Sequence, residues 1–314
     1  MRIVFMGTPE FAVSIMDAIH QSKHELVAVV TAPDKPAGRG RKLRASAVKQ
    51  YSEKANLPLL QPIKLKDPEF LAELKNYEAD LFIVVAFRML PREVWQMPSK
   101  GTMNLHASLL PQYRGAAPIN WVIVNGESKT GLSTFFINEE IDTGDIFMQS
   151  ELDIGSNETA GELHDRMMLK GQTLVLDSID NIEKGTVSTS VQSHIKDDEI
   201  KYAPKIFKED LEINWNNPKE QIHNLIRGMS PFPGAWTNLN LAGDEFKVKI
   251  FKSALIDEAS PHPPKSLYAR GKRLFVALEN GQLEVLELQL EGKKRMKALD
   301  FLNGQEIDQN AHFS

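Results

Sequence analysis

Cysteine is absent from this sequence of 314 residues. The absence excludes disulfide bonds, thiolate nucleophiles and cysteine-ligated zinc sites in one step. Long apolar runs are missing as well. A membrane-spanning helix needs about 20 consecutive apolar residues, and no run in this sequence approaches that length. The first segment, MRIVFMGTPEF, is interrupted too soon for a signal peptide. We therefore expect a cytoplasmic protein that has no membrane partner.

A large excess of charge of one sign is also missing, because the formal net charge is only −5. The cations nevertheless gather in one segment, DKPAGRGRKLRASAVK, where a single acid, Asp34, stands among six lysines and arginines. Such a segment can neutralise phosphates of a nucleic acid, but it is more often an ordinary solvated loop. Taken alone, the charge pattern favours the solvated loop.

The first part of the chain alternates between strand-like and helix-like segments. Continuous apolar runs, typical of strands buried on both faces, occur in RIVFMG, ELVAVVTA and DLFIVVAF, and GTMNLH is a shorter strand. Helical periodicity separates several of these runs. The alternation predicts an α/β fold with a Rossmann-like, mostly parallel sheet and helices on both faces, whose ligands bind beyond the carboxyl ends of the strands.

After Gly185 the sequence becomes polar and then turns into short strand-like segments separated by turns such as AGDE and ENG. This texture predicts a small antiparallel β-barrel, which resembles the oligonucleotide-binding (OB) type. We expect a first domain at 1–188, a linker at 189–208 and an OB-like domain at 209–314.

Two polar residues stand at the end of a predicted strand, in the stretch MNLHASLLPQYRG. Asn104 and His106 are two residues apart, so their side chains project from the same face of the strand. A carboxamide donates hydrogen bonds to an oxygen that becomes negative, and an imidazole takes up and returns a proton near neutral pH. Together they are suited to acyl transfer to an amine, although a histidine at a strand end is more often structural.

An acidic turn, EEIDTGD, lies between two later strand-like segments and carries Asp142 and Asp145. An acid in this turn could orient the imidazole or increase its basicity. A plain aspartate turn with a glycine is the commoner explanation of such a pattern.

Other chemistries have little support in the sequence. Ser108 lacks the surrounding pattern of a nucleophile elbow, and no group of histidines and acids has metal-ligand spacing, so we expect no catalytic metal. GTPEF stands where a dinucleotide loop would, but it lacks the three-glycine fingerprint, and Pro9 removes an N–H that could hold phosphate. A dehydrogenase is therefore disfavoured.

Several stretches resemble the 10-formyltetrahydrofolate-dependent formyltransferases, and the resemblance covers nearly the whole chain. These stretches are GTPEFAV, TAPDKPAGRGRKL, NLHASLLPQYRGAAPI, TGLSTFFINEEIDTGDIF, RGMSPFPGAW and GKKRMKALDFL. The second is similar to the loop that marks the branch of the family that acts on methionyl initiator tRNA. The resemblance implies transfer of a formyl group from 10-formyltetrahydrofolate to the α-amine of that tRNA, a step that supports translation initiation.

The resemblance also implies a role for each of the three polar residues. Asn104 would polarise the formyl carbonyl and hold the oxyanion, His106 would act as general base, and Asp142 would orient the histidine. Transfer would be direct, with 10-formyltetrahydrofolate as co-substrate and without a metal.

The folate would bind at the strand ends, largely through backbone groups. The residues that the resemblance assigns to this pocket are Phe87, Arg88, Met89, Leu90, Ser108, Leu109, Leu110, Pro111 and Asp145. The loop departs from the family at one point. Arg88 directly follows Phe87, whereas the family has an aromatic residue, glycine, any residue and Ile-Leu-Pro, so the loop is one residue shorter.

For the tRNA, the resemblance implies that the basic loop enters the acceptor stem and that the second domain adds a basic stripe. The residues assigned to tRNA binding are Lys35, Arg39, Arg41, Lys42, Arg44, Lys205, Lys208, Lys247 and Lys249. Lys247 and Lys249 share a strand face, although an ordinary solvent face of a sheet would also carry such residues.

Two alternatives remain open from the sequence. A formyltransferase that acts on a small amine, such as glycinamide ribonucleotide or an amino sugar, would keep the polar trio but would not need KPAGRGRKLR. A non-catalytic RNA-binding protein would need the basic loop but not the trio. We expect a monomer.

Overall fold

The structure is a computed structural model that describes residues 1–37, 42–192 and 199–314. The chain forms two compact units. The first contains Met1–Gly115, Gly131–Leu152 and His164–Tyr202, and the second contains Ala116–Thr130, Asp153–Leu163 and Ala203–Ser314. The chain therefore passes between the units several times. The sequence-based division at 1–188, 189–208 and 209–314 stays a prediction.

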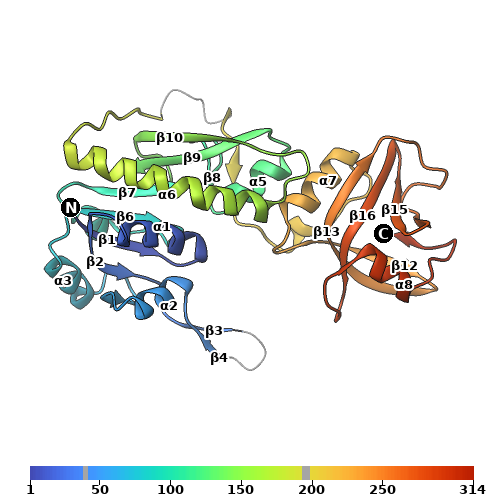
Figure 1. Cartoon of the computed structure of the whole chain (residues 1–314), viewed down its shortest axis with the longest axis horizontal. Helices are drawn as coiled ribbons and strands as arrows, with labels where there is room; N and C mark the ends of the chain where they lie inside the picture. The colour runs from blue at the N-terminus through green and yellow to red at the C-terminus, as the bar shows by residue number, and fades with distance from the viewer. Residues whose placement is uncertain (38–41, 193–198) are drawn as a thin grey trace. The chain divides into compact units, whose positions relative to one another are not determined.

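The first unit is built on a sheet with the strand order β10-β9-β7-β6-β1-β2-β5 (Figure 1). The strands are β1 (Arg2–Gly7), β2 (Glu25–Val30), β5 (Leu59–Leu60), β6 (Leu81–Val85), β7 (Thr102–His106), β9 (Lys129–Phe136) and β10 (Ile146–Asp153). The neighbours from β5 to β7 pair in parallel, and β9 joins β7 antiparallel. Every residue of β6 is buried, as a strand covered on both faces requires. The predicted Rossmann-like, mostly parallel sheet is confirmed.

Helices cover both faces of this sheet. They are α1 (Glu10–His20), α2 (Ala47–Lys54), α3 (Pro68–Asn76), α4 (Arg92–Trp95) and α6 (Ala160–Lys184). α1 and α6 lie side by side over one face (Figure 1), and a Cβ at Gly171 of α6 would lie 3.0 Å from the Cδ1 atom of Ile15 in α1. On the other face, Phe70, Leu74 and Val94 of α3 and α4 pack in a buried cluster with residues of β1 and β6.

Short strands complete the first unit. β3 (Lys35–Ala37) and β4 (Lys42–Arg44) pair antiparallel at the two described ends of the basic loop, with Lys35 opposite Arg44. β8 (Arg114–Gly115) and β11 (Tyr202–Ala203) form a further two-stranded sheet. Within the described residues, no helix is long and apolar enough to cross a membrane.

The second unit contains an antiparallel sheet that curls around a buried apolar core. Its strands are β12 (Ala235–Leu241), β13 (Asp244–Ile256), β14 (Leu267–Arg270), β15 (Arg273–Leu278), β16 (Gly281–Leu290), β17 (Met296–Lys297) and β18 (His312–Phe313). The register of β13 against β16 shifts between Ile250 and Ser253, and such irregularities bend a sheet. The predicted antiparallel C-terminal β domain is confirmed.

The helices of the second unit are α5 (Pro118–Val124), α7 (Lys219–Gly228) and α8 (Ala298–Gly304), with a 3₁₀ turn, η2 (Glu209–Leu211). α5 and α7 lie close together because Gly228 has no side chain, and a Cβ there would lie 2.6 Å from a methyl group of Val124.

Candidate active site at the carboxyl edge of the sheet

The candidate site lies where β6 and β7 end. These strands are parallel neighbours, with Val84 opposite Asn104, so their carboxyl ends meet at one edge of the sheet (Figure 1). Asn104 is partly buried, and His106 is only 6% exposed. Among the described residues, the Asn104 carboxamide has no hydrogen-bond partner. It is therefore a donor and acceptor that the fold itself leaves unused.

A backbone carbonyl determines which nitrogen of His106 carries the proton. Nε2 of His106 lies 2.8 Å from the carbonyl oxygen of Tyr113. A carbonyl oxygen only accepts hydrogen bonds, so Nε2–H must be the donor, and in the neutral ring Nδ1 keeps its lone pair. Nδ1 lies 3.7 Å from Oδ2 of Asp142. The basic nitrogen of the imidazole therefore faces a carboxylate.

Asp142 reaches the histidine from a constrained turn between β9 and β10. Its backbone has φ 56°, a conformation that side-chain-bearing residues rarely adopt. The backbone N–H of Gly115 donates to Oδ2 of Asp142 over 3.0 Å. The structure thus brings Asp142, the acid that the resemblance assigns to the site, close to His106. Asp145 is exposed, and its backbone oxygen accepts from Phe136 N at 3.1 Å.

Gly144 allows the Asp142 turn to pack against the end of β9. A Cβ on Gly144 would lie only 1.7 Å from the carbonyl oxygen of Phe136. We predict that Gly144→Ala displaces the turn and lowers the kcat of the reaction catalysed at this site about 100-fold, because a misplacement of about 1 Å can cost that much. Steady-state kinetics with purified protein measures the effect. Gly304→Ala, where a Cβ meets no atom within 4 Å, is the control, and an unchanged kcat in Gly144→Ala would contradict the prediction.

The residues predicted to shape the folate pocket after β7 form a compact turn. Ser108 is buried and donates from Oγ to Gln112 O at 2.6 Å, and the buried Leu110 donates from its N–H to Ser133 Oγ at 3.0 Å. Leu109 covers Gly131, where a Cβ would lie 2.5 Å from the leucine Cδ2 atom. Pro111 is partly buried. Ser108 and Leu110 therefore hold the backbone of this turn rather than offering free side chains.

Arg88 explains how the shortened loop after β6 is held. Its guanidinium donates from Nη1 to the carbonyl of Ile63 over 3.0 Å and from Nη2 to the carbonyl of Pro62. Burial lowers the pKa of the Arg88 guanidinium. Cζ of the Arg88 guanidinium lies 5.6 Å from the ring centre of Phe87, within the range of a cation–π contact. Arg88 thus ties this loop to residues 62–63.

The remaining residues of this loop differ in exposure. Met89 is 67% exposed, whereas Leu90 is 8% exposed and belongs to the core beneath the sheet. Met89 is therefore an exposed apolar side chain of the loop, and Phe87 is partly buried.

The basic loop is described only at its two ends. Lys35 and Arg44 are exposed on β3 and β4, and Lys42 lies in β4. Arg39 and Arg41 lie outside the described residues. Lys49, at the end of the basic segment, is bound to Asp34 at 2.7 Å.

In the second unit, predicted tRNA-binding lysines gather around Trp236. Nζ of Lys247 lies 3.4 Å from the ring centre of Trp236, and Lys249 stands opposite Trp236 on the neighbouring strand. The indole N–H donates to the carbonyl of Lys208 over 3.3 Å. Lys205 is exposed, and its Nζ lies 5.5 Å from the ring centre of Phe207. Lys205 and Lys247 thus each lie near an aromatic ring, a combination found at nucleic-acid-binding sites, whereas the ammonium of Lys249 donates to the carbonyl of Pro233 at 2.7 Å.

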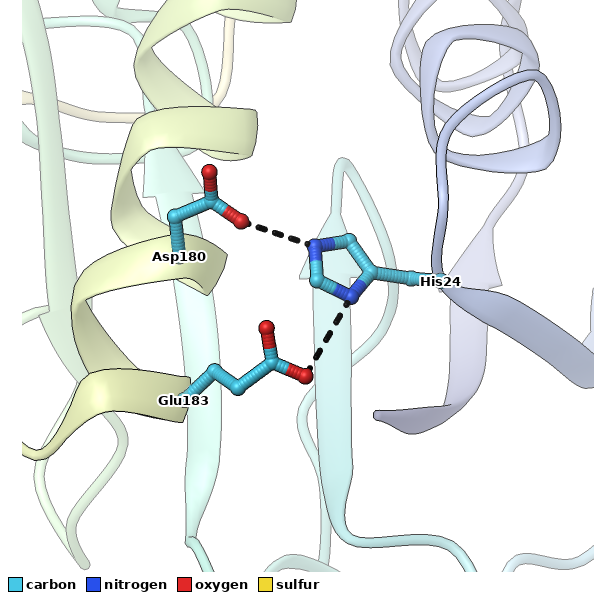
Figure 2. Close-up of side chains that lie close together, drawn as sticks. All are labelled: His24, Asp180 and Glu183. Atoms are coloured by element: carbon cyan, nitrogen blue, oxygen red, sulfur yellow. Dashed lines mark hydrogen bonds and ion pairs between the residues drawn. The ribbon is translucent and has the colours of Figure 1, made fainter.

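A second group of charged side chains, drawn in Figure 2, lies next to the beginning of β2. His24 precedes β2, and its Nε2 lies 3.2 Å from Asp180, while its Nδ1 lies 4.0 Å from Glu183. In the described part of the chain, this is the group whose spacing would suit a metal ion. Lys23 lies 2.8 Å from Asp180, and the Met1 amino group lies 3.1 Å from Glu183. The two carboxylates are therefore balanced by cations already, and hydrogen bonding to Asp180 raises the pKa of Lys23.

Comparison with known proteins agrees with the fold. The model of the formyl transferase family matches residues 1–179, and the model of the formyl transferase C-terminal domain matches residues 205–306. The chain therefore belongs to the formyl transferase family.

The similarity to individual relatives is more specific. The methionyl-tRNA formyltransferase of Flavobacterium johnsoniae is 53% identical over 304 residues, which cover 97% of this chain and 96% of that protein. The methionyl-tRNA formyltransferase of Bacteroides fragilis is 48% identical over 307 residues, covering 97% and 95%. Within the family, the chain groups with the methionyl-tRNA formyltransferases.

Solved structures share the fold at lower sequence identity. The N-formyltransferase of Helicobacter canadensis, in complex with folinic acid and dTDP-3-aminofucose, has a TM-score of 0.67 at 20% identity, and the match covers 90% of this chain and 98% of that one. HypX of Aquifex aeolicus, in complex with tetrahydrofolic acid, has a TM-score of 0.67 at 19% identity over 98% of this chain and 48% of its own.

Proposed function

We propose that this enzyme transfers the formyl group of 10-formyltetrahydrofolate to the α-amine of methionyl initiator tRNA, and so supports translation initiation. The observation that carries the proposal is the distance of 3.7 Å between Nδ1 of His106 and the carboxylate of Asp142, with Asn104 two residues before His106 on β7. The near-full-length similarity to methionyl-tRNA formyltransferases supports this choice of substrate.

We assign a role to each member of the trio. The amine nitrogen attacks the formyl carbon, and the Asn104 carboxamide donates a hydrogen bond to the oxygen that becomes negative. Nδ1 of His106 takes the proton from the amine, and the Asp142 carboxylate stabilises the imidazolium. When the bond between the formyl carbon and folate N10 breaks, the imidazolium returns the proton to that nitrogen. The products are formylmethionyl-tRNA and tetrahydrofolate, and no covalent enzyme intermediate forms.

We place the folate between the loop after β6, the turn after β7 and the Asp142 turn. The residues predicted to surround it are Phe87, Arg88, Met89, Leu90, Ser108, Leu109, Leu110, Pro111 and Asp145. Backbone groups of the two loops would bind the polar edge of the pterin, and Met89 would contribute apolar contact. The reaction uses proton transfer and hydrogen bonding by Asn104, His106 and Asp142, and we propose that it requires no metal.

The tRNA would meet cations from both units. The basic loop, with Lys35, Arg39, Arg41, Lys42 and Arg44, would contact the acceptor stem, and Lys205, Lys208, Lys247 and Lys249 would contact further phosphates. Lysine and arginine that neutralise phosphates release counterions, which makes such binding sensitive to salt. An enzyme that acts on aminoacyl-tRNA works in the cytoplasm, and we propose a cytoplasmic monomer.

Removing two exposed cations of the second unit should weaken tRNA binding in a way that depends on salt. We predict that Lys205→Ala/Lys208→Ala raises KM for the charged tRNA roughly tenfold at low salt. The slope of log KM against the logarithm of the salt concentration should fall by about one for each phosphate that is no longer neutralised. The difference from wild type should shrink as salt rises, while KM for the folate stays constant. Steady-state kinetics across a salt series measures this.

The control for that experiment is Lys75→Ala/Lys100→Ala, which removes the same charge from exposed positions of the first unit. If KM for the charged tRNA depends on salt in the same way in Lys205→Ala/Lys208→Ala, in the control and in wild type, a role of the two lysines in phosphate binding is contradicted.

The proposed function is tested by the identity of the product. Formyl-labelled 10-formyltetrahydrofolate is supplied with charged initiator tRNA and, separately, with glycinamide ribonucleotide or an amino sugar. We expect label on the tRNA, released as N-formylmethionine after hydrolysis of the ester. Label on a small amine alone would favour the alternative substrate class, and tRNA binding without any transfer would favour a non-catalytic RNA-binding protein.

A further inference from the structure

Gln192 is a buried glutamine in the segment for which the sequence predicts a linker. It is 6% exposed, and both hydrogens of its amide are used: Nε2 donates to the carbonyl of Asp142 at 3.1 Å and to the carbonyl of Gly144 at 2.6 Å. Its Oε1 accepts from Nε and Nη2 of Arg114 at 3.2 and 2.8 Å. One side chain therefore joins the Asp142 turn to β8.

Gln192 holds residues 113–115 through Arg114. The backbone of this stretch contacts both His106 and Asp142. The carbonyl of Tyr113 accepts from Nε2 of His106, and the N–H of Gly115 donates to the carboxylate of Asp142. Arg114, between them, is the residue that Gln192 binds. Gln192 thus connects the Asp142 turn to residues 113–115, whose backbone orients Asp142 and His106.

The Asp142 turn needs such support from outside. A residue with φ 56° that is not glycine occupies a sparsely populated conformation, which persists only when surrounding contacts impose it. The segment that carries Gln192 is itself fixed two residues earlier, where Ser190 and Ile146 exchange backbone hydrogen bonds of 2.7 and 3.0 Å. The amide of Gln192 is therefore delivered from an anchored backbone.

We propose that Gln192 is a positioning residue for formyl transfer, which holds the carboxylate of Asp142 against Nδ1 of His106. This inference rests on the proposed function of the trio. Gln192 touches neither substrate, and it acts only by fixing the place of Asp142. Its loss should lower kcat and leave the KM for tRNA almost unchanged.

The test is a double-mutant cycle between Gln192→Leu and Asp142→Asn. Gln192→Leu removes both donors and the acceptor, and we expect kcat to fall about 10- to 100-fold, as for a catalytic group displaced by up to about 1 Å. Residues that act as a unit are not additive, so Gln192→Leu should lower kcat little further in the Asp142→Asn background. Fully additive losses, or an unchanged kcat in the single variant, would overturn the inference.

Two further variants separate positioning from general damage. Gln172→Leu is the matched control, because the Gln172 amide also binds backbone, donating to the carbonyl of Ser14 at 3.2 Å, but it joins α6 to α1 and not the Asp142 turn to β8. We expect this control to keep the wild-type kcat. If Gln192→Leu fails to fold, Gln192→Glu keeps the size and the acceptor for Arg114 while removing both donors, and the same cycle is run with it.

The cycle is measured with whichever amine wild type formylates. Failure of wild type to formylate methionyl-tRNA would defeat the proposed function, whereas a wild-type enzyme that is active beside an equally active Gln192→Leu variant would defeat only the positioning role.

Discussion

Replacing His106 by glutamine should reduce formyl transfer about 10³- to 10⁴-fold, near the upper range for loss of a general base. A glutamine amide can still donate to the carbonyl of Tyr113, which Nε2 of His106 now binds at 2.8 Å, but it cannot take a proton from an amine. The buried carbonyl therefore keeps a donor, and the loss reports on proton transfer. Single-turnover formylation of charged initiator tRNA measures the rate.

Binding of the charged tRNA is the control for this variant, because no cation assigned to the tRNA is changed. We expect its dissociation constant to match that of wild type. A His106→Gln enzyme that keeps near-normal turnover would show that another group removes the proton, and the role assigned to Nδ1 would be wrong.

Replacing Asn104 by alanine should lower kcat about 10²- to 10³-fold, the effect of removing one donor to an oxyanion. The Asn104 carboxamide has no hydrogen-bond partner among the described residues, so its removal leaves no protein group unpaired. The melting temperature should therefore change little while kcat falls. Steady-state kinetics and a thermal melt measure the two quantities.

The balance between kcat and KM decides what Asn104 does. An interaction made in the transition state lowers kcat when it is removed, whereas removal of an interaction made equally with bound substrate raises only KM. A variant with the wild-type kcat and a raised KM for 10-formyltetrahydrofolate would show that the carboxamide binds the ground state and does not stabilise the oxyanion.

Much of the sheet could be predicted from sequence because buried parallel strands are continuous apolar runs. RIVFMG and DLFIVVAF became β1 and β6, and their carboxyl ends mark the edge where ligands bind. The spacing of Asn104 and His106 sufficed to place both on β7, since alternate residues share a face. Asp142 could be joined to them only through the family resemblance, because spacing along the chain does not show which turn returns to which strand.

The contacts of Gln192 and Arg88 could not be predicted, because the donors of both side chains bind backbone carbonyls. A side chain that donates to carbonyls places no demand on the identity of its partners and leaves no pattern in the sequence. The segment around Gln192 also lacks apolar periodicity, which is typical of a linker, although it is fixed to the first unit at Ser190 and Gln192. In the same way, the shorter loop gives no hint that Arg88 binds residues 62–63.

The most direct test of the trio is a crystal structure of the enzyme with a stable dideaza analogue of the donor that keeps the formyl group on N10. We predict that the pterin lies at the carboxyl ends of β6 and β7, with the formyl oxygen about 3 Å from the Asn104 carboxamide nitrogen. Nδ1 of His106 should face the side from which an amine would approach. A formyl group bound beyond hydrogen-bond reach of both Asn104 and His106 would contradict the account.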